Sequence, residues 1–349
     1  MKLGLNLGYW GSKPIDRFIE LAVRAEALGF DIVCTAEAYG SDVFTPLAAI
    51  AARTSRIRLG TSIMQISART PTCAATTAMT LDHISNGRLC LGVGVSGPQV
   101  VEGWYGQPFR KPLERTREWL AVFQKVVARE APVVFEGQQL RLPYAGEHAT
   151  GLGKPLMSIT HPLRKRIPVF LGAEGPKNVE LAFREFDGWF PIFMPPERFD
   201  VFEAQLALAR PGFEILCTVD MALSDDRATA LLPLKRNIAL YVGGMGSKEE
   251  NFHKRMVERS GYGEAAQRIQ DLWLAGRQAE AVDAVPDELA ESISLVGSPA
   301  QVRTRLAAWR VSPVTTLMIS RSATFDETVR NMEFLAAELP ANERPASAR

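Results

Sequence analysis

Short runs of alternating apolar and small or polar residues recur along the chain, and stretches with helical spacing follow them. Residues 3–8 place three leucines on one face of a strand, and glycine and asparagine on the other. Residues 15–22 then carry apolar side chains at i, i+3, i+4 and i+7, the spacing of a helix. Gly29 follows at the position typical of a helix end. The chain therefore opens with a strand-then-helix unit.

The same unit repeats to the end of the chain. Strands are predicted at residues 3–8, 31–36, 57–62, 88–94, 168–172, 187–192, 213–220 and 314–319. Helices are predicted between them, and two begin with an N-cap and proline pair, Thr70-Pro71 and Ser298-Pro299. Eight strands alternating with helices predict an α/β fold, a closed parallel (β/α)8 TIM barrel.

An open, doubly wound sheet is the alternative architecture. Its dinucleotide-binding form requires a GxGxxG motif after the first strand, and none is present there. Residues 92–97 (GVGVSG) contain closely spaced glycines after the fourth strand, but their spacing is wrong and no helix is predicted to open directly after them. The barrel is therefore favoured.

Two segments interrupt the alternation. Residues 130–166 are rich in Gly, Pro and polar residues and hold no long helical pattern, so they are predicted to be an insertion after the fourth helix. Residues 225–291, after the seventh strand, are mostly helical, with breaks at Gly243-Gly244 and Gly261. We expect one barrel domain over residues 1–340, followed by a frayed tail at 341–349.

Charge and cysteine content limit the partners. The formal net charge is +1, which gives no footprint for nucleic acid or an anionic membrane. Cys34, Cys73, Cys90 and Cys217 form no CxxC pair and lie near no histidine at metal-ligand spacing, so buried free thiols are expected. No signal peptide and no apolar run of about 18 residues is evident. These features predict a cytoplasmic protein with no membrane or nucleic-acid partner.

The active site of such a barrel lies at the carboxyl ends of its strands. The residues predicted there are aromatic or small, with few ionisable groups and no cluster typical of a metal site. Such a rim suits a bound redox cofactor, because the cofactor carries the reactive atom and the protein shapes and orients it.

Two strand ends have sequences that are typical of cofactor-binding segments. In residues 172–178 (GAEGPKN), Gly175 exposes backbone amides, Pro176 opens a helix and Lys177 adds positive charge, which together suit a phosphate. A plain strand-to-helix turn is the alternative. Residues 60–66 (GTSIMQI) fit either an ordinary long strand or a backbone bulge pressed against a flat ring.

Three segments in order resemble the luciferase-like monooxygenase family. They are FDIVCTAEAYGSDVFTPLAAIAARTSRIRLGTSIMQISARTP, RLCLGVGVSGPQVVEGWYG and IPVFLGAEGPKNVELAFREFDGWF. Within the family they look most like the deazaflavin-dependent branch. The resemblance is close over about residues 1–195 and holds in outline beyond them. It implies an oxidoreductase that transfers a hydride between coenzyme F420 and a small organic substrate.

The resemblance also implies site residues. Ser62-Ile63 matches the family's non-prolyl cis peptide, a bulge behind the cofactor ring. Gly94, Val95 and Ser96 match the segment that lines the cofactor tail. The cofactor phosphate is implied at the loop Gly172, Ala173, Glu174, Gly175 and Pro176, with Lys177 beside it.

Glu37 occupies the position where relatives place an acidic residue or histidine beside the ring. It is the candidate proton donor or acceptor, because a carboxyl beside an apolar ring can have its pKa raised toward neutrality. An exposed, ion-paired glutamate is the alternative. The motif Ala36-Glu37-Ala38 carries no histidine, which disfavours sugar-phosphate oxidation. Trp10, Tyr39 and Trp104 are candidate walls of a substrate pocket, or packing residues.

Two other functions remain open at this stage. An FMN-dependent monooxygenase that uses O2 would have the same scaffold, and sequence motifs separate it poorly from a deazaflavin enzyme. A flavin-binding barrel without turnover, or a subunit of a heterodimer, belongs to a different class. A homodimer or higher homo-oligomer is expected from the resemblance and from the frequency of symmetric oligomers.

Overall fold

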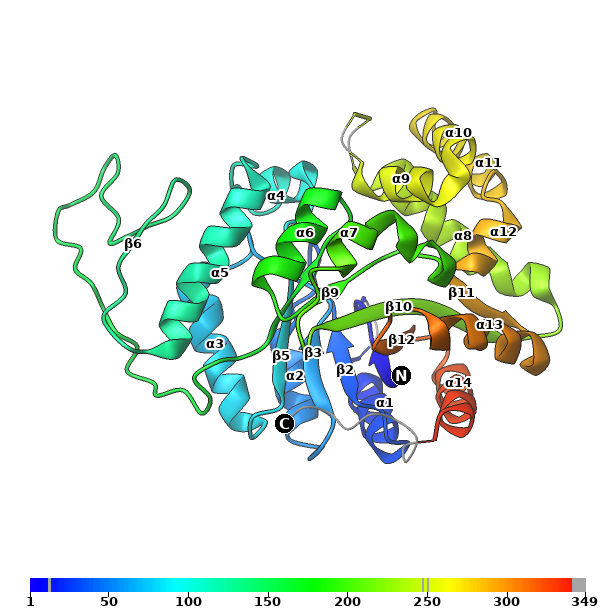
Figure 1. The fold of residues 1–349 in the computed structure, drawn as a ribbon, viewed down its shortest axis with the longest axis horizontal. Helices are drawn as coiled ribbons and strands as arrows, with labels where there is room; N and C mark the ends of the chain where they lie inside the picture. Colours follow the sequence, from blue (N-terminus) through cyan, green and yellow to red (C-terminus); the bar gives the residue numbers. More distant parts are fainter. Residues whose placement is uncertain (12–13, 247, 250, 341–349) are drawn as a thin grey trace.

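Eight parallel strands close into a ring in the computed structural model, which describes residues 1–11, 14–246, 248–249 and 251–340 (Figure 1). In order around the ring they are β1 (Lys2–Asn6), β2 (Ile32–Thr35), β3 (Arg58–Thr61), β5 (Leu89–Gly94), β8 (Val169–Gly172), β9 (Gly188–Phe190), β10 (Glu214–Leu223) and β12 (Thr316–Ser320). Pairing of β1 with β12, in register from Lys2 with Thr316, closes the ring. The predicted (β/α)8 barrel is confirmed.

Helices surround the ring, and their ends follow the predicted signals. They are α1 (Asp16–Ala27), α2 (Phe44–Ala51), α3 (Pro71–Ile84), α5 (Pro112–Ala128), α6 (Pro176–Glu185), α7 (Glu203–Leu206), α13 (Pro299–Val311) and α14 (Phe325–Glu338), with a 3-10 turn η1 (Pro196–Phe202) before α7. The hydroxyl of Thr70 accepts the backbone N–H of Cys73 and caps α3. Ser298 and Gln301 form a capping box at α13.

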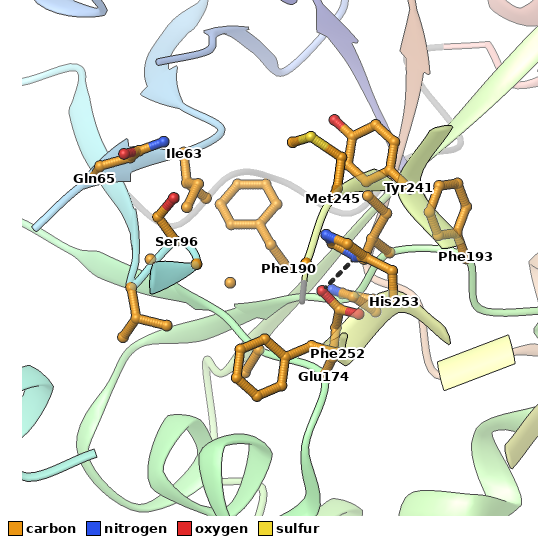
Figure 2. A pocket seen from close by; sticks show the side chains of 18 of the residues that line it. Ile63, Gln65, Ser96, Glu174, Phe190, Phe193, Tyr241, Met245, Phe252 and His253 are labelled. Atoms are coloured by element: carbon orange, nitrogen blue, oxygen red, sulfur yellow. Dashed lines mark ion pairs between the residues drawn. The ribbon is translucent and has the colours of Figure 1, made fainter. Parts of the chain in front are cut away.

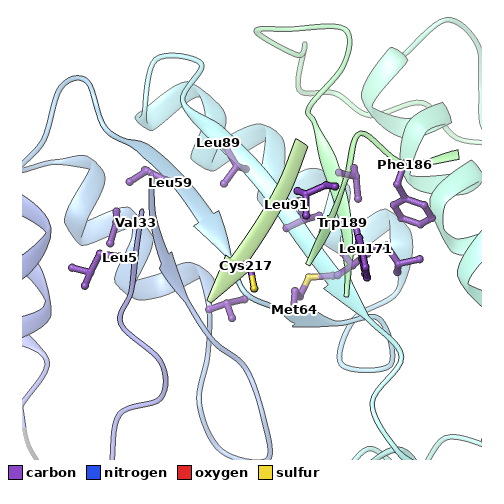
Figure 3. Packing of buried hydrophobic residues seen from close by; sticks show 14 of the residues in the cluster. Leu5, Val33, Leu59, Met64, Leu89, Leu91, Leu171, Phe186, Trp189 and Cys217 are labelled. Atoms are coloured by element: carbon purple, nitrogen blue, oxygen red, sulfur yellow. The ribbon is translucent and has the colours of Figure 1, made fainter. Parts of the chain in front are cut away.

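The two faces of each strand meet different layers. Leu3, Leu5 and Leu7 are buried in the layer between strands and helices, part of which is shown in Figure 3. A Cβ on Gly4 would instead meet Met318 and Ile32 inside the ring. The interior holds one apolar cluster, made of Ile32, Cys34, Cys90, Phe170, Phe190, Leu216 and Met318. Small inward-facing residues therefore leave room for this cluster, as the alternation predicts.

A buried ion cluster spans the ring at the start of several strands. The guanidinium of Arg58 contacts both carboxylate oxygens of Glu214, at 2.7 and 2.8 Å, and Oδ2 of Asp31 at 2.9 Å from Nε. Lys2 Nζ lies 3.6 Å from the same glutamate. These contacts link β1, β3 and β10 at the end of the barrel opposite the strand-end face.

The first insertion is a largely irregular arm. It contains a hairpin of β6 (Phe135–Glu136) and β7 (Arg141–Leu142), and Figure 1 shows it extending away from the barrel. The carboxylate of Glu118 on α5 anchors it by accepting the backbone N–H groups of residues 138, 139 and 140. The predicted lack of a long helix between 130 and 166 is confirmed.

The second insertion is a helical subdomain with its own apolar core. It consists of α8 (Arg227–Gly244), α9 (Phe252–Val257), a π-helical turn η2 (Glu258–Tyr262), α10 (Gly263–Leu274), α11 (Gln278–Asp283) and α12 (Asp287–Ser292). The predicted breaks fall at the end of α8 and at Gly261, whose φ of 99° suits glycine. Phe193, after β9, belongs to this second core and joins the subdomain to the barrel.

Of the two interpretations of residues 60–66, the backbone bulge is confirmed: β3 ends at Thr61, a cis peptide follows, and the chain resumes as β4 (Met64–Gln65). Three details of the sequence prediction are corrected. A short helix, α4 (Pro98–Gly103), does open after residues 92–97, and an extra strand, β11 (Ser294–Gly297), pairs with β10.

The third correction concerns the thiols: Cys73 is exposed, whereas the other three cysteines are buried. The tail predicted at 341–349 lies outside the described residues. Among the residues described, no helix has the length and apolar character to cross a membrane.

Candidate functional site

A cavity of about 1490 Å³ opens at the carboxyl ends of the strands, between the barrel and the helical subdomain. It brings together nearly all the residues predicted for the site: Glu37, Tyr39, Ser62, Ile63, Gly94, Val95, Ser96, Trp104, Gly172, Ala173, Glu174, Gly175, Pro176 and Lys177. Tyr39 and Trp104 are more than half exposed, at its mouth. Trp10 is not among the lining residues and packs edge-on against Phe18 instead.

One wall of the cavity is the backbone bulge at Ser62-Ile63, which we call the shelf. The peptide between Ser62 and Ile63 is cis, as the resemblance implies. The side chain of Ile63 lies against Gly94 and Gly172, and a Cβ on either glycine would contact it. Glycines at the ends of β5 and β8 therefore admit an apolar side chain that faces the cavity.

Glu37 braces this shelf from behind. Its backbone N–H donates to the carbonyl of Ile63 at 3.2 Å, and its carboxylate accepts the backbone N–H of Gln65 at 3.0 Å. The other carboxylate oxygen lies 2.6 Å from Nη1 of Arg69. Burial raises the pKa of Glu37, and the ion pair with Arg69 partly offsets this. The glutamate is ion-paired but only 5% exposed, so the exposed alternative is wrong.

A second wall is the N-terminus of α6. Gly175 is the N-cap and Pro176 the first helical residue. A Cβ on Gly175 would meet nothing within 4 Å, so the space beside this helix end is open to the cavity. Lys177 and Arg259 also line the cavity, and Nη1 of Arg259 donates to the carbonyl of Glu174 at 3.1 Å. Amides at a helix start and neighbouring cations suit an anion.

The sequence did not identify the third wall, which the helical subdomain supplies. Figure 2 shows Tyr241, Met245 and His253 on the side of the cavity opposite Ile63 and Ser96. Nδ1 of His253 lies 2.9 Å from Oε1 of Glu174. No motif in residues 225–291 marks these positions, because the contact joins segments about 80 residues apart.

The floor of the cavity is polar. Asn6, Thr218, Asp220 and Ser320 line it from the ends of β1, β10 and β12. Burial raises the pKa of Asp220, and a hydrogen bond with Ser320 partly offsets this. Asp220 was not predicted from the sequence as a residue of the cavity, although it lies in the predicted seventh strand, at 213–220.

The donor and acceptor groups fit a flavin-type cofactor. Oε2 of Glu174 and Oδ1 of Asn178 are buried acceptors without a donor in the described part of the chain, and the hydroxyls of a ribityl chain are donors. The shelf at Ile63 is apolar, and the α6 terminus suits a phosphate. Within the described ranges, no group of three or more His, Cys, Asp or Glu side chains is placed to hold a metal ion.

Comparison with known proteins identifies the family. The model of the luciferase-like monooxygenase family matches residues 4–316. A Mycobacterium tuberculosis protein assigned as a coenzyme F420-dependent oxidoreductase is 50% identical over 344 residues, which cover 96% of this chain and 99% of that protein.

Two further relatives are more distant. A 5,10-methylenetetrahydromethanopterin reductase of Archaeoglobus fulgidus is 27% identical over 306 residues, 84% of each chain. The solved structure of the F420-dependent tetrahydromethanopterin reductase of Methanopyrus kandleri superposes with a TM-score of 0.77 at 22% identity, covering 97% of each chain, which shows the shared fold. From the family match and the 50% identity, the chain belongs to the luciferase-like monooxygenase family.

Proposed function

We propose that this protein is an F420-dependent oxidoreductase that transfers a hydride between the deazaflavin cofactor and a small organic substrate. The observation that carries the proposal is the pairing of an apolar shelf at Ile63 with the open helix start at Gly175, across one cavity. The assignment of the Mycobacterium tuberculosis relative, at 50% identity, supports the choice of cofactor.

Each wall has a separate task toward the cofactor. The shelf at Ile63 would support the ring, and the backbone at Gly94 and Gly172 lets the ring lie close. The α6 terminus and Lys177 would hold the phosphate, and the free acceptors of Glu174 and Asn178 would take hydroxyl groups of the chain between them. When bound, the deazaflavin supplies or accepts the hydride.

Glu37 is proposed to position the shelf rather than to exchange a proton with substrate. Its two carboxylate oxygens already accept N–H groups from Gln65 and Arg69, and its backbone holds Ile63. A carboxylate held by two donors on the protein is poorly placed to release or take a further proton during turnover.

The alternative is an FMN-dependent monooxygenase on the same scaffold. Mixing the purified protein with oxidised F420, and separately with FMN, and following cofactor fluorescence distinguishes the two. We expect saturable quenching of F420 and weaker or no quenching of FMN. Tight FMN binding without F420 binding contradicts the proposal.

We also propose a cytoplasmic homodimer. Buried free thiols at Cys34, Cys90 and Cys217 suit a reducing compartment. Exposed apolar side chains on the first insertion, Leu152 and Ile159 among them, offer surface that a second copy could cover. Light scattering on the purified protein tests the dimer, and a monomeric mass contradicts it.

A further inference from the structure

The wall opposite the shelf is a packed aromatic surface with one basic group in it. The rings of Phe193 and Tyr241 lie 5.4 Å apart, and the ring of His253 lies 4.8 Å from Tyr241, all edge to face. Met245 and Phe252 extend this surface along the cavity (Figure 2). A ring seated on Ile63 would leave the remaining space bounded by this wall, so the wall faces the substrate rather than the cofactor.

His253 lines the cavity with one ring nitrogen beside a carboxylate. Nδ1 lies 2.9 Å from the carboxylate of Glu174, on the loop before α6. The two groups are within ion-pair distance, although Nδ1 makes no hydrogen bond of standard geometry among the described residues. A carboxylate beside Nδ1 orients the ring, so Nε2 is the nitrogen that would exchange a proton with a substrate. Of the chain's four histidines, all within the described residues, His253 alone lines the cavity.

The other ionisable groups of the cavity are less suited to this task. Lys177, Arg255 and Arg259 carry hydrogen-bond donors and no acceptor. Burial raises the pKa of the Tyr9 and Tyr241 phenols further above neutrality. Glu37 is held by two N–H donors, and Asp220 lies at the floor, hydrogen-bonded to Ser320.

We propose that His253, oriented by Glu174, exchanges the proton that accompanies hydride transfer, and that the substrate is an uncharged, apolar carbonyl compound or the matching alcohol. This inference rests on the proposed function, which supplies the hydride. In the reducing direction, the carbonyl carbon accepts the hydride and the C=O double bond becomes a single bond. The oxygen takes the proton from Nε2, the imidazolium becomes neutral imidazole, and an alcohol leaves. Alcohol oxidation reverses each step.

The substrate class follows from the wall. Aromatic and thioether side chains stabilise an apolar body by burial, whereas Lys177 and Arg259 lie by the α6 terminus, where the cofactor phosphate is proposed. A volume of about 1490 Å³ exceeds the roughly 300–1,000 Å³ of one small-molecule site. Cofactor and an apolar substrate therefore fit together.

The test uses the full-length protein with reduced F420 and four probes: acetone, cyclohexanone, 2-octanone and acetophenone. A separate assay with oxidised F420 and glucose 6-phosphate is the comparison in the oxidising direction. We expect kcat/KM to rise from acetone to the larger ketones and no oxidation of glucose 6-phosphate. In His253→Asn we expect turnover to fall on the order of 10²-fold with unchanged F420 quenching, and the pH dependence of kcat/KM to lose its imidazole limb. His253→Gln is the second variant in case the first folds poorly.

His148→Asn is the matched control, since its side chain is 89% exposed, and it should behave as wild type. Wild-type turnover in a folded His253 variant overturns the inference. So does loss of F420 binding in that variant, which would make His253 a cofactor ligand. Wild-type protein that binds F420 but reduces none of the ketones overturns the inference and leaves the proposed function standing. Absence of F420 quenching in wild type defeats the proposed function itself.

Discussion

The side chain of Ile63 fills the space that a Cβ on Gly94 would occupy. β4 follows the cis peptide and pairs with β5. Ile63 can pack against β5 at this point because residue 94 is a glycine and has no side chain. The shelf can project into the cavity only because β5 ends in glycine at this point. The proposed binding site for the cofactor ring therefore depends on Gly94 as well as on the bulge at Ser62-Ile63.

Gly94→Ala should therefore weaken both the fold and the cofactor seat. The added methyl would push Ile63 from its place, and overpacking of this kind costs about 1–3 kcal/mol of unfolding free energy. We expect a measurable rise in the Kd for F420 and a lower melting temperature. Gly263→Ala is the control, because a Cβ there meets nothing within 4 Å. Equal F420 affinity in wild type and Gly94→Ala would mean that the position of Ile63 does not contribute to cofactor binding.

Gly175→Val tests the phosphate seat. Gly175 precedes α6 and has open space beside it, so a branched side chain would obstruct backbone approach to an anion. We expect at least about a tenfold loss of F420 affinity, of the order of one hydrogen bond to a charged group. Deazaflavin lacking the phosphate should bind wild type and variant alike. A variant that loses both ligands equally would show a general distortion instead.

Glu37→Gln separates positioning from proton transfer. The amide can still accept the N–H of Gln65 but loses the ion pair with Arg69. If Glu37 only supports the shelf, turnover should fall less than about tenfold, short of the ~10²-fold typical of a general acid. A hundredfold slower rate, with F420 affinity retained, would identify Glu37 as the proton donor.

The ion cluster at the other end of the barrel governs acid stability. Burial raises the pKa of Glu214, but its contacts with Arg58 and Lys2 outweigh this and hold the pKa below its usual value. A lowered folded-state pKa gives stability that is present above the unfolded value of about 4.3 and lost as pH falls through the folded value. Glu214→Gln should lose about 3 kcal/mol at neutral pH.

Denaturant unfolding at several pH values measures this effect. The difference between wild type and Glu214→Gln should shrink as the pH is lowered from 6 toward 3. The exposed pair of Glu136 and Arg141 is the control, with side chains 64% and 49% exposed. Its Glu136→Gln variant should change stability by no more than about 1 kcal/mol. A pH-independent difference at Glu214 would mean that its charge is not what stabilises the barrel.

The sequence predicts the barrel well because alternation and helix caps are local. Thr70 and Ser298 cap helices where their proline partners indicate. The resemblance also implies the cis peptide at Ser62-Ile63, which the structure contains. The short elements were not predicted. β11 has four residues and α4 has six, which are too few for a periodic pattern to be recognised.

The residues on the substrate side of the cavity could not be predicted from the sequence for a different reason. His253 and Glu174 meet only through the packing of the helical subdomain on the barrel, and neither carries a local signal of that contact. For Trp10 the sequence leaves two alternatives open, a pocket wall or a packing residue. An aromatic residue after the first strand suggests a pocket wall, but its ring packs on Phe18 and does not line the cavity.

A crystal structure with F420 bound shows where the cofactor lies. We expect a deazaflavin ring lying on Ile63, its phosphate at the start of α6 beside Gly175, and open space between the ring and His253. A ring bound away from the Ser62-Ile63 bulge, or a phosphate held elsewhere on the protein, would contradict this expectation.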